Sequence, residues 1–362
     1  MDEFRGKARI QEHVVPISNT FVAAYLITIV GVALISNVIL LMVLKRKRKL
    51  RSFHWCAAAL SISDVLFNIL LHPMSIATSL GFDPSIIFNY YGCIYFGFVA
   101  LTLGCYNMAI HALLAIIRYV NICHPEKVYW FRKRTMLYIL ITAAVYSLLW
   151  SSGPFFGVGK YETFEVGCTI AFDDNSIPGR IFITCAFIFV FFLPLIVIIT
   201  SYGKITIQVK RLRKKLLCVG NLSIGKYRKT QVPLKVTSPQ LKMIKLTAII
   251  AGCFIIAWSP YAIVCLWQSY IDHSLSRIYI IVAALFCKSA TAYNPFIYMF
   301  MSKSIQKETS KMFYGFIKTC YHHESAVNAS KSSRKSSYVR TSLKSSWIYS
   351  KSSRYSQQTS HV

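Results

Sequence analysis

Long apolar segments alternate with short polar ones along most of the chain. The apolar segments cover residues 20–44, 53–80, 90–117, 135–158, 179–203, 243–268 and 277–301. Each ends at charged residues, at proline or glycine, or at a polar cluster, and each is long enough to cross the hydrocarbon core of a membrane, which takes about 20 helical residues. The pattern predicts an all-α membrane protein, a bundle of seven transmembrane helices over residues 20–301.

Three further parts lie outside this bundle. Residues 1–19 are predicted to form an extracellular N-terminus. Residues 302–320 set apolar Met312, Phe313 and Ile317 against lysines, which is typical of a short amphipathic eighth helix lying on the membrane surface. Cys320 at its end is a predicted palmitoylation site. Residues 321–362 are rich in serine and lysine and are predicted to be a disordered cytoplasmic tail.

Composition and charge distribution favour membrane lipid over nucleic acid as the partner of the basic residues. The chain of 362 residues is 55% hydrophobic with a mean hydropathy of +0.47, too apolar for a soluble chain of this length. Its formal net charge is +28, but 34 of the 41 lysines and arginines fall on one side of the predicted membrane and six on the other. This asymmetry predicts a cytoplasmic C-terminus and an extracellular N-terminus in the cell membrane. Basic loops beside anionic lipid explain the charge, and no nucleic-acid-binding motif accompanies them.

Two of the 11 cysteines fall at the predicted extracellular face. Cys93 opens the third apolar segment, and Cys168 lies in the second outer loop. Most of the other cysteines lie within spans or face the reducing cytosol. We therefore predict a disulfide between Cys93 and Cys168, which would hold the loop over the bundle.

Lys288 is the only basic residue in the middle of an apolar segment, six positions before Asn294-Pro295. At about 1.5 Å per helical residue it lies near the middle of the bilayer. An ammonium at that depth costs roughly 2.5–3.5 kcal/mol even on the most lenient scale, so it should be paired, face a cavity or be chemically modified. The alternative is a structural lysine that pairs or snorkels within the bundle.

Motifs along the segments carry a family resemblance. In chain order they are Asn37, Asp64, Cys93, Arg118-Tyr119, Pro194, Tyr202, Trp258-Ser259-Pro260-Tyr261 and Asn294-Pro295-Phe296-Ile297-Tyr298. Each motif is weak alone, but this order and spacing are highly specific. From about Asn37 to Cys320 the chain resembles a rhodopsin-like G protein-coupled receptor, specifically an opsin close to the neuropsin and peropsin branches.

The resemblance implies a cofactor and a site for it. Lys288 matches the opsin lysine that condenses with retinal, 11-cis or all-trans, to form a Schiff base, chemistry that a primary amine and an aldehyde allow. Trp258, Tyr261 and Tyr95 would supply aromatic walls of the retinal site. Phe96 occupies the place where vertebrate visual opsins carry a glutamate counterion, so it would line the site without supplying that charge.

The acidic residues are few enough to search for another counterion. Of the 13 aspartates and glutamates only Asp64 lies inside a predicted span, and it resembles the family's residue of the ion- and water-filled interior. Glu162, six residues before Cys168, matches the counterion of many non-visual and invertebrate opsins, and we predict this role through a longer, water-mediated contact. Glu162 and Glu165 could instead be two exposed loop carboxylates.

His72, just before Pro73, is another group within a span that can titrate near neutral pH. Neuropsins carry a lysine there that influences spectral tuning, so the resemblance assigns His72 to the retinal site and puts ultraviolet sensitivity in doubt. A hydrogen-bonded structural histidine is at least as good an interpretation. His111, in the third segment, is predicted to belong to the core.

The resemblance also implies coupling to a heterotrimeric G protein. The residues assigned to activation and coupling are Asp64, Arg118, Tyr119, Tyr202, Asn294, Pro295 and Tyr298. Ile117 departs from the family, because most relatives have an acid there that pairs with the arginine at rest; we therefore predict raised activity in darkness. The serine-rich tail predicts phosphorylation by receptor kinases and binding of arrestin. The terminal Ser360-His361-Val362 fits a ligand of a PDZ protein.

Three functions remain open at this point. The first is a light-sensitive receptor, a non-visual opsin that activates a G protein when retinal photoisomerises, and the long basic third inner loop and the serine-rich tail favour it. The second is a retinal photoisomerase of the peropsin or retinochrome kind, which Ile117 mildly favours. The third is a light-independent chemoreceptor derived from an opsin, which would keep Lys288 by descent. The receptor interpretation predicts neither a catalytic residue nor a metal site.

Overall fold

A computed structural model describes residues 19–47, 49–164, 167–222, 238–271, 275–303, 305–315 and 317–319. The predictions made for the N-terminal tail, for Cys320 and for the tail that follows it lie outside these residues. The chain divides into two compact units, Met1–Gln306 and Lys307–Val362, which are considered separately.

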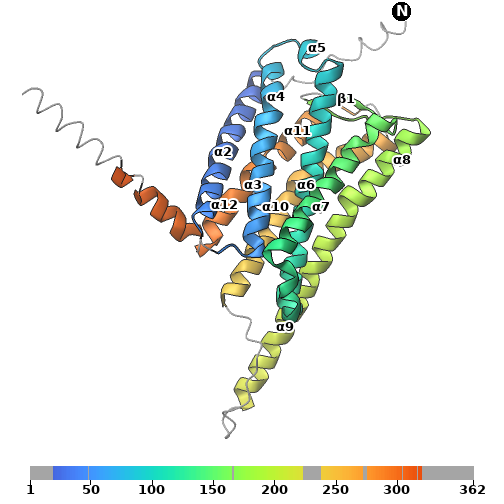
Figure 1. Cartoon of the computed structure of the whole chain (residues 1–362). Helices are drawn as coiled ribbons and strands as arrows, with labels where there is room; N and C mark the ends of the chain where they lie inside the picture. The colour runs from blue at the N-terminus through green and yellow to red at the C-terminus, as the bar shows by residue number, and fades with distance from the viewer. Residues whose placement is uncertain are drawn as a thin grey trace, which may run out of the picture. The chain divides into compact units, whose positions relative to one another are not determined.

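Helices make up most of the first unit (Figure 1). The helices are α2 (Asn19–Lys45), α3 (Ser52–Leu70), α4 (His72–Ser79), α5 (Pro84–Ile87), α6 (Tyr90–Cys123), α7 (Lys133–Ser152), α8 (Ile177–Ala186), α9 (Leu193–Leu222), α10 (Ser238–Tyr270), α11 (Arg277–Lys288) and α12 (Ala290–Met301). Three further helical turns are present: the 3₁₀ turns η1 (Pro125–Phe131) and η2 (Gly153–Phe156), and the π-helical turn η3 (Phe187–Phe192).

Seven stretches of the described helices are long and apolar enough to cross a membrane. They are Asn19–Lys45, Ser52–Ser79, Tyr90–Cys123, Lys133–Phe156, Ile177–Leu212, Ile244–Tyr270 and Ile278–Phe300. The predicted all-α bundle of seven transmembrane helices is therefore confirmed, and the chain is a multi-pass membrane protein. Two helices extend past their predicted ends at residues 117 and 203, because backbone hydrogen bonds continue where the apolar pattern stops.

Breaks in two of the spans lie close to Lys288. Pro73, the second residue of α4, has no N–H to donate, so the helical ladder is interrupted between α3 and α4. In the seventh span the hydroxyl of Ser289 donates to the backbone oxygen of Phe286 at 2.6 Å, which competes with the ladder. The break at Ser289 makes Lys288 the last residue of α11.

The third span, α6, occupies the centre of the bundle. It packs against α3, α7, α9 and α10, and against both strands of a hairpin. In Figure 1, β1 and α5 lie at the same end of the bundle. Every residue that reaches inward from α6 therefore has neighbours from several other spans.

The hairpin consists of β1 (Tyr161–Phe164) and β2 (Gly167–Ile170), paired antiparallel so that Glu162 faces Thr169. Tyr161 fastens it to the bundle: a Cβ on Gly97 of α6 would lie 2.4 Å from the Tyr161 ring, so only glycine fits there. Burial raises the pKa of Tyr161 above its usual value. The phenol therefore keeps its proton and donates it to the backbone oxygen of Ser151 at 2.6 Å.

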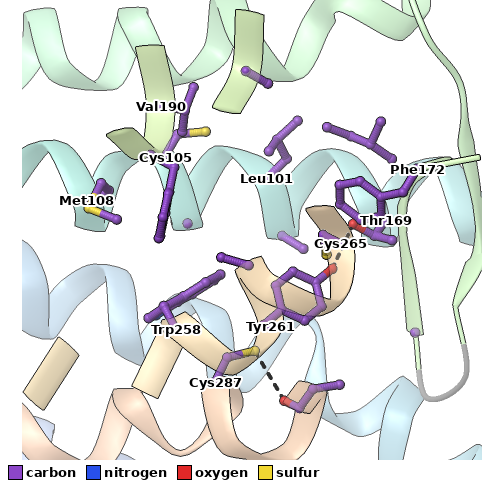
Figure 2. A pocket seen from close by; sticks show the side chains of 18 of the residues that line it. Leu101, Cys105, Met108, Thr169, Phe172, Val190, Trp258, Tyr261, Cys265 and Cys287 are labelled. Atoms are coloured by element: carbon purple, nitrogen blue, oxygen red, sulfur yellow. Dashed lines mark hydrogen bonds between the residues drawn. The ribbon is translucent and has the colours of Figure 1, made fainter. Parts of the chain in front are cut away.

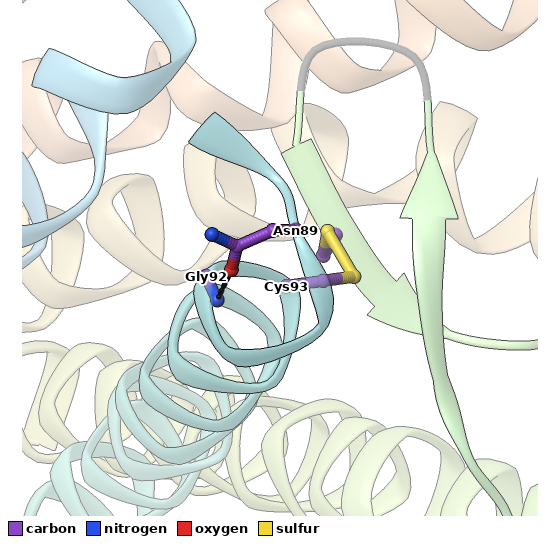
Figure 3. The surroundings of a disulfide bond; sticks show 4 residues. Asn89, Gly92 and Cys93 are labelled. Carbon is purple, nitrogen blue, oxygen red and sulfur yellow. Dashed lines mark hydrogen bonds between the residues drawn. A yellow bond between two sulfur atoms is a disulfide. The ribbon is translucent and has the colours of Figure 1, made fainter. Parts of the chain in front are cut away.

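The predicted disulfide between Cys93 and Cys168 is present (Figure 3). Asn89 caps α6 by accepting a hydrogen bond from the N–H of Gly92 at 2.9 Å, so the helix begins where Cys93 can meet β2. The bridge joins positions 75 residues apart. It holds β2 against the end of the bundle.

In the second unit, residues 307–315 and 317–319 are helical, where the amphipathic pattern predicts a helix. Glu308 pairs with Lys311 at 3.0 Å, three residues apart on one face. The position of this helix on the membrane surface remains a prediction.

Candidate functional site

A cavity lies between α6, α8, η3, α10, α11 and β2 (Figure 2). The volume open to the centres of water-sized molecules is about 200 Å³. By the same measure a cavity that holds one water needs only about 10–15 Å³. Its aromatic lining residues are Phe67, Phe96, Phe172, Phe187, Phe191, Phe254, Trp258 and Tyr261. Among the described residues that line it, Lys288 alone carries a charge. The cavity therefore suits an elongated apolar molecule that meets one amine.

Lys288 is 8% exposed and enters the cavity from the end of α11. Its Nζ donates to Oγ of Ser75 in α4 at 3.0 Å, and it lies 5.3 Å from the centre of the Phe96 ring. No ion pair joins Lys288 to a carboxylate in the described part of the chain. The buried ammonium is thus held by one hydroxyl and one aromatic face.

Trp258 and Tyr261, two of the predicted aromatic walls, line the cavity from α10 (Figure 2). Their rings meet edge to face with centres 6.1 Å apart. The hydroxyl of Tyr261 donates to Oγ1 of Thr169 in β2 at 3.0 Å, which ties α10 to the hairpin. Tyr95 does not line the cavity: it is 43% exposed, and its hydroxyl lies 3.5 Å from the backbone oxygen of Leu70. Tyr95 is one residue before the inward-facing Phe96, and one residue turns a helix by about 100°.

Glu162 lies outside the cavity lining, with 49% of its side chain exposed. Its carboxylate is 3.8 Å from Nζ of Lys160. Thr169 stands directly opposite Glu162 in the hairpin, so both side chains are on one face, and Thr169 accepts the hydrogen bond from Tyr261. The structure therefore places Glu162 opposite Thr169, which lines the cavity, but outside the lining itself, and its counterion role stays a prediction.

His72 is completely buried in α4, three residues before Ser75, so the two share a helix face. Its ring packs against Phe67 with centres 5.5 Å apart. The backbone of Phe67 also interacts with the imidazole as a hydrogen-bond partner. The alternative of a hydrogen-bonded structural histidine therefore remains open beside a role in the retinal site.

Asp64 organises a buried polar cluster beside the cavity. Nδ2 of Asn107 donates to one of its carboxylate oxygens at 3.0 Å, and Nδ2 of Asn294 donates to the other at 3.3 Å. Asn37 donates to the backbone oxygen of Thr291 at 2.9 Å. Four spans thus meet here, and one of them, through α12, contains Pro295.

Arg118 is buried at the opposite end of α6 from Cys93. Its guanidinium lies 4.6 Å from the centre of the Phe53 ring, and Phe53 in turn meets Tyr298 edge to face at 5.2 Å. The hydroxyl of Tyr119 forms a hydrogen bond of 3.0 Å with Nε2 of His124. Tyr202 packs against a small apolar cluster between α6, α9 and α10, formed by Ala112, Ala115, Ile198 and Ala251. Phe53 thus contacts the guanidinium of Arg118 through its aromatic face.

Three residues of these contacts were missed by sequence reasoning: Ser75, Thr169 and Phe53. Each reaches its partner from another span or from the hairpin, and serine, threonine and phenylalanine are common in such segments. The helical spacing of Ser75 from His72 is the one signal that could have pointed to it.

Residues 36–298 match the family described as 7 transmembrane receptor (rhodopsin family). The chain belongs to this family of membrane receptors. It is similar to opsins, namely Opsin-5 of Homo sapiens (28% identity, 76% of this chain and 77% of that protein) and the visual pigment-like receptor peropsin of Homo sapiens (28% identity, 82% and 85%). The crystal structure of squid rhodopsin matches with a TM-score of 0.73, 21% identity, and coverage of 85% of this chain and 89% of that one, which shows the shared fold.

Proposed function

We propose that the protein is a light-sensitive receptor that binds retinal covalently through Lys288 and activates a heterotrimeric G protein. The observation that carries this proposal is the single amine in an otherwise uncharged, aromatic cavity. The similarity to Opsin-5 and peropsin supports it. The N-terminus would be extracellular and the C-terminus cytoplasmic, as the distribution of basic residues predicts.

The cavity residues fit retinal. Retinal supplies an aldehyde that condenses with an amine, with loss of water, and a polyene that changes shape when it absorbs light. Lys288 would provide the amine, and Phe96, Trp258 and Tyr261 would confine the polyene. The apolar lining excludes water, which protects the linkage from hydrolysis.

Glu162 is proposed as the counterion that acts across the hairpin through Thr169 and Tyr261. Changing Glu162 to glutamine is expected to lower the fraction of retinal-loaded protein that absorbs in the visible range at neutral pH, because an anion favours the protonated linkage. Absorption spectra of the two proteins measure this fraction. Glu126→Gln, which removes an exposed carboxylate beside His124, is the matched control. Identical spectra for wild type and Glu162→Gln would exclude the counterion role.

Coupling is proposed at the end of the bundle that contains Arg118, Tyr119, Tyr202 and Tyr298. Asp64, Asn294 and Pro295 lie between this end and the cavity, where a change in the cavity can alter helix packing. The basic inner loops would contact the G protein, and the serine-rich tail would bind receptor kinases and arrestin.

Ile117→Glu is expected to lower G protein activation in darkness about fivefold, the factor that corresponds to roughly 1 kcal/mol for an ion pair with Arg118. The physical reason is that Phe53 restrains the guanidinium in the wild type only through its ring. GTP exchange by retinal-loaded protein in darkness measures the effect. Ile117→Gln adds a side chain of similar size to glutamate but without its charge, so its rate of GTP exchange in darkness should stay higher than that of Ile117→Glu. A wild type with no dark activity would contradict the prediction.

The decisive experiment is to purify the full chain with 11-cis- or all-trans-retinal, record its absorption before and after illumination, and then measure GTP exchange. An adduct with light-dependent exchange supports the receptor. The absence of any adduct rejects retinal binding.

A photoisomerase is the second candidate function, favoured by Ile117, which leaves Arg118 without its usual acid. This candidate predicts light-driven conversion and release of retinal isomers without GTP exchange. Analysis of the retinal isomers extracted after illumination separates it from the receptor.

A further inference from the structure

His111 is a polar side chain in the interior of the third span. It is 1% exposed, which agrees with its predicted place in the core. Nδ1 of its ring lies 2.7 Å from the backbone oxygen of Asn107, one helical turn earlier. A backbone oxygen only accepts, so Nδ1 donates in this bond and Nε2 is left for another partner. A buried imidazole costs more than an apolar side chain unless its nitrogens are used, so its partners matter.

The imidazole joins the third span to the sixth and the seventh. Its ring stacks on Phe254 of α10, with centres 4.1 Å apart and an angle of 22° between the planes. The side chain of Asn294 in α12 also interacts with the imidazole as a hydrogen-bond partner. The amide of Asn294 contains both donors and an acceptor, so it can serve Nε2 and also donate to Asp64 at 3.3 Å. His111 therefore contacts two spans that also contribute to the polar cluster or to the cavity wall.

Ring contacts continue from His111 to the large cavity. The centre of the Phe254 ring is 5.7 Å from that of Trp258, which lines the cavity (Figure 2). Phe254 and Trp258 also line a small space of about 10 Å³ together with Asp64 and Asn294. Packed side chains thus connect the cavity wall to the polar cluster, and the imidazole belongs to this connection. Such a connection carries a signal only if its members are energetically coupled, which measurements on variants can decide.

We propose that His111 is a positioning residue that couples the cavity wall to the polar cluster. Its hydrogen bond with Asn294 holds α12 in the resting arrangement, beside Pro295. Its stack on Phe254 passes a displacement of Trp258 to the third span. Arg118 lies seven residues further along α6, two helical turns away on the same face. The signalling part of this proposal rests on the receptor function proposed above, but the link between the spans exists without retinal.

The first test separates the two contacts of His111 by two substitutions. His111→Phe keeps a ring on Phe254 and loses the hydrogen bond with Asn294, so GTP exchange in darkness should rise about fivefold while the light response remains. His111→Gln keeps an amide where Nε2 lies and loses the stack, so the dark rate should stay within about twofold of wild type while the light response falls. If His111 only fills space, the phenylalanine variant will match wild type in darkness, and that result overturns the proposal.

Two further variants guard against damage to the fold. His111→Asn is polar like His111→Gln but reaches only as far as Nδ1, so its dark rate should rise as in His111→Phe. Equal dark rates in His111→Asn and His111→Gln would contradict the role of Asn294. Ser147→Ala is the control, because it removes a buried hydrogen bond within α7, from the hydroxyl to the backbone oxygen of Ala143 at 2.7 Å. It should leave both rates unchanged.

The second test asks whether Phe254 and His111 act through the same contact. Phe254→Leu removes the ring between Trp258 and His111, so the light response per retinal adduct should fall as it does in His111→Gln. Combining the two substitutions should lower the response no further, because either one already breaks the connection. A double variant whose loss is the product of the two single losses would show separate actions and would reject the stack as the route.

The third test needs neither retinal nor a G protein. Hydrogen exchange of backbone amides is measured in the full chain without retinal, and the amides of α12 next to Asn294 should exchange about fivefold faster in His111→Phe than in wild type or His111→Gln. If no retinal adduct or no light-dependent GTP exchange is found, the receptor function fails while these exchange rates still decide the link. Equal exchange in wild type and His111→Phe would show that His111 does not hold α12, and the proposal would be abandoned.

Discussion

Lys288→Ala is expected to abolish the absorption band that retinal acquires on binding, because the variant has no amine to condense with the aldehyde. In the described residues that line the cavity, no other side chain offers a primary amine. The effect should be complete loss of covalent retinal, with at most weak apolar binding in the cavity. Absorption spectra before and after acid denaturation measure it, since covalently held retinal stays with the chain.

Two variants sharpen the Lys288 experiment. Lys288→Arg keeps a positive charge at the same place but provides a delocalised guanidinium, so it should also fail to bind retinal covalently. Ser75→Ala removes the hydroxyl 3.0 Å from Nζ and should leave the covalent attachment intact. A visible band that survives in Lys288→Ala would exclude Lys288 as the attachment site of retinal.

Simultaneous replacement of Cys93 and Cys168 with alanine should destabilise the protein by about 4 kcal/mol, the chain-entropy value for a disulfide that closes a loop of 75 residues. We expect the thermal unfolding midpoint to fall by roughly 5–6 °C. Retinal binding should weaken as well, because Gly167, Cys168 and Thr169 all line the cavity from β2. Thermal unfolding and the yield of retinal adduct measure the two effects.

The matched control for this prediction is Cys123→Ala, which removes a free cysteine at the end of α6. It should change the midpoint by much less, and reducing agent should lower the midpoint of this control as it does that of the wild type. An unchanged midpoint in the double variant would show that packing, through Tyr161 and Ser151, holds the hairpin without the bridge.

Sequence reasoning assigned Lys288 and several aromatic residues to one site, and the structure places some of them around one cavity for reasons that differ from residue to residue. Trp258 and Tyr261 were predicted from a motif in which they stand three residues apart, a spacing that places both on one face of a helix. Tyr95 was assigned by position alone, and it turns away while its neighbour Phe96 turns inward. Phe53 was missed because nothing in its own segment shows that Arg118 packs on it.

The counterion illustrates a different difficulty. Counting residues from Cys168 locates Glu162 in the correct loop, but the exposed fraction of its side chain depends on how the hairpin lies on the bundle. The pairing of Glu162 with Thr169, and of Thr169 with Tyr261, is a property of strand register and helix packing together. Such contacts join parts of the chain that no local pattern relates.

The sequence by itself determined the seven spans, the place of Lys288 in the middle of the last one and the disulfide, because hydrophobic length and the positions of charges and cysteines relative to the spans are read directly from residue order. Only the tertiary structure decided what surrounds the amine. Lys288 meets Ser75 across 213 residues of chain, with Phe96 over its charge and His72 buried on the same helix face as Ser75. Helix rotation and packing set these contacts, since they determine which side of each apolar helix faces inward.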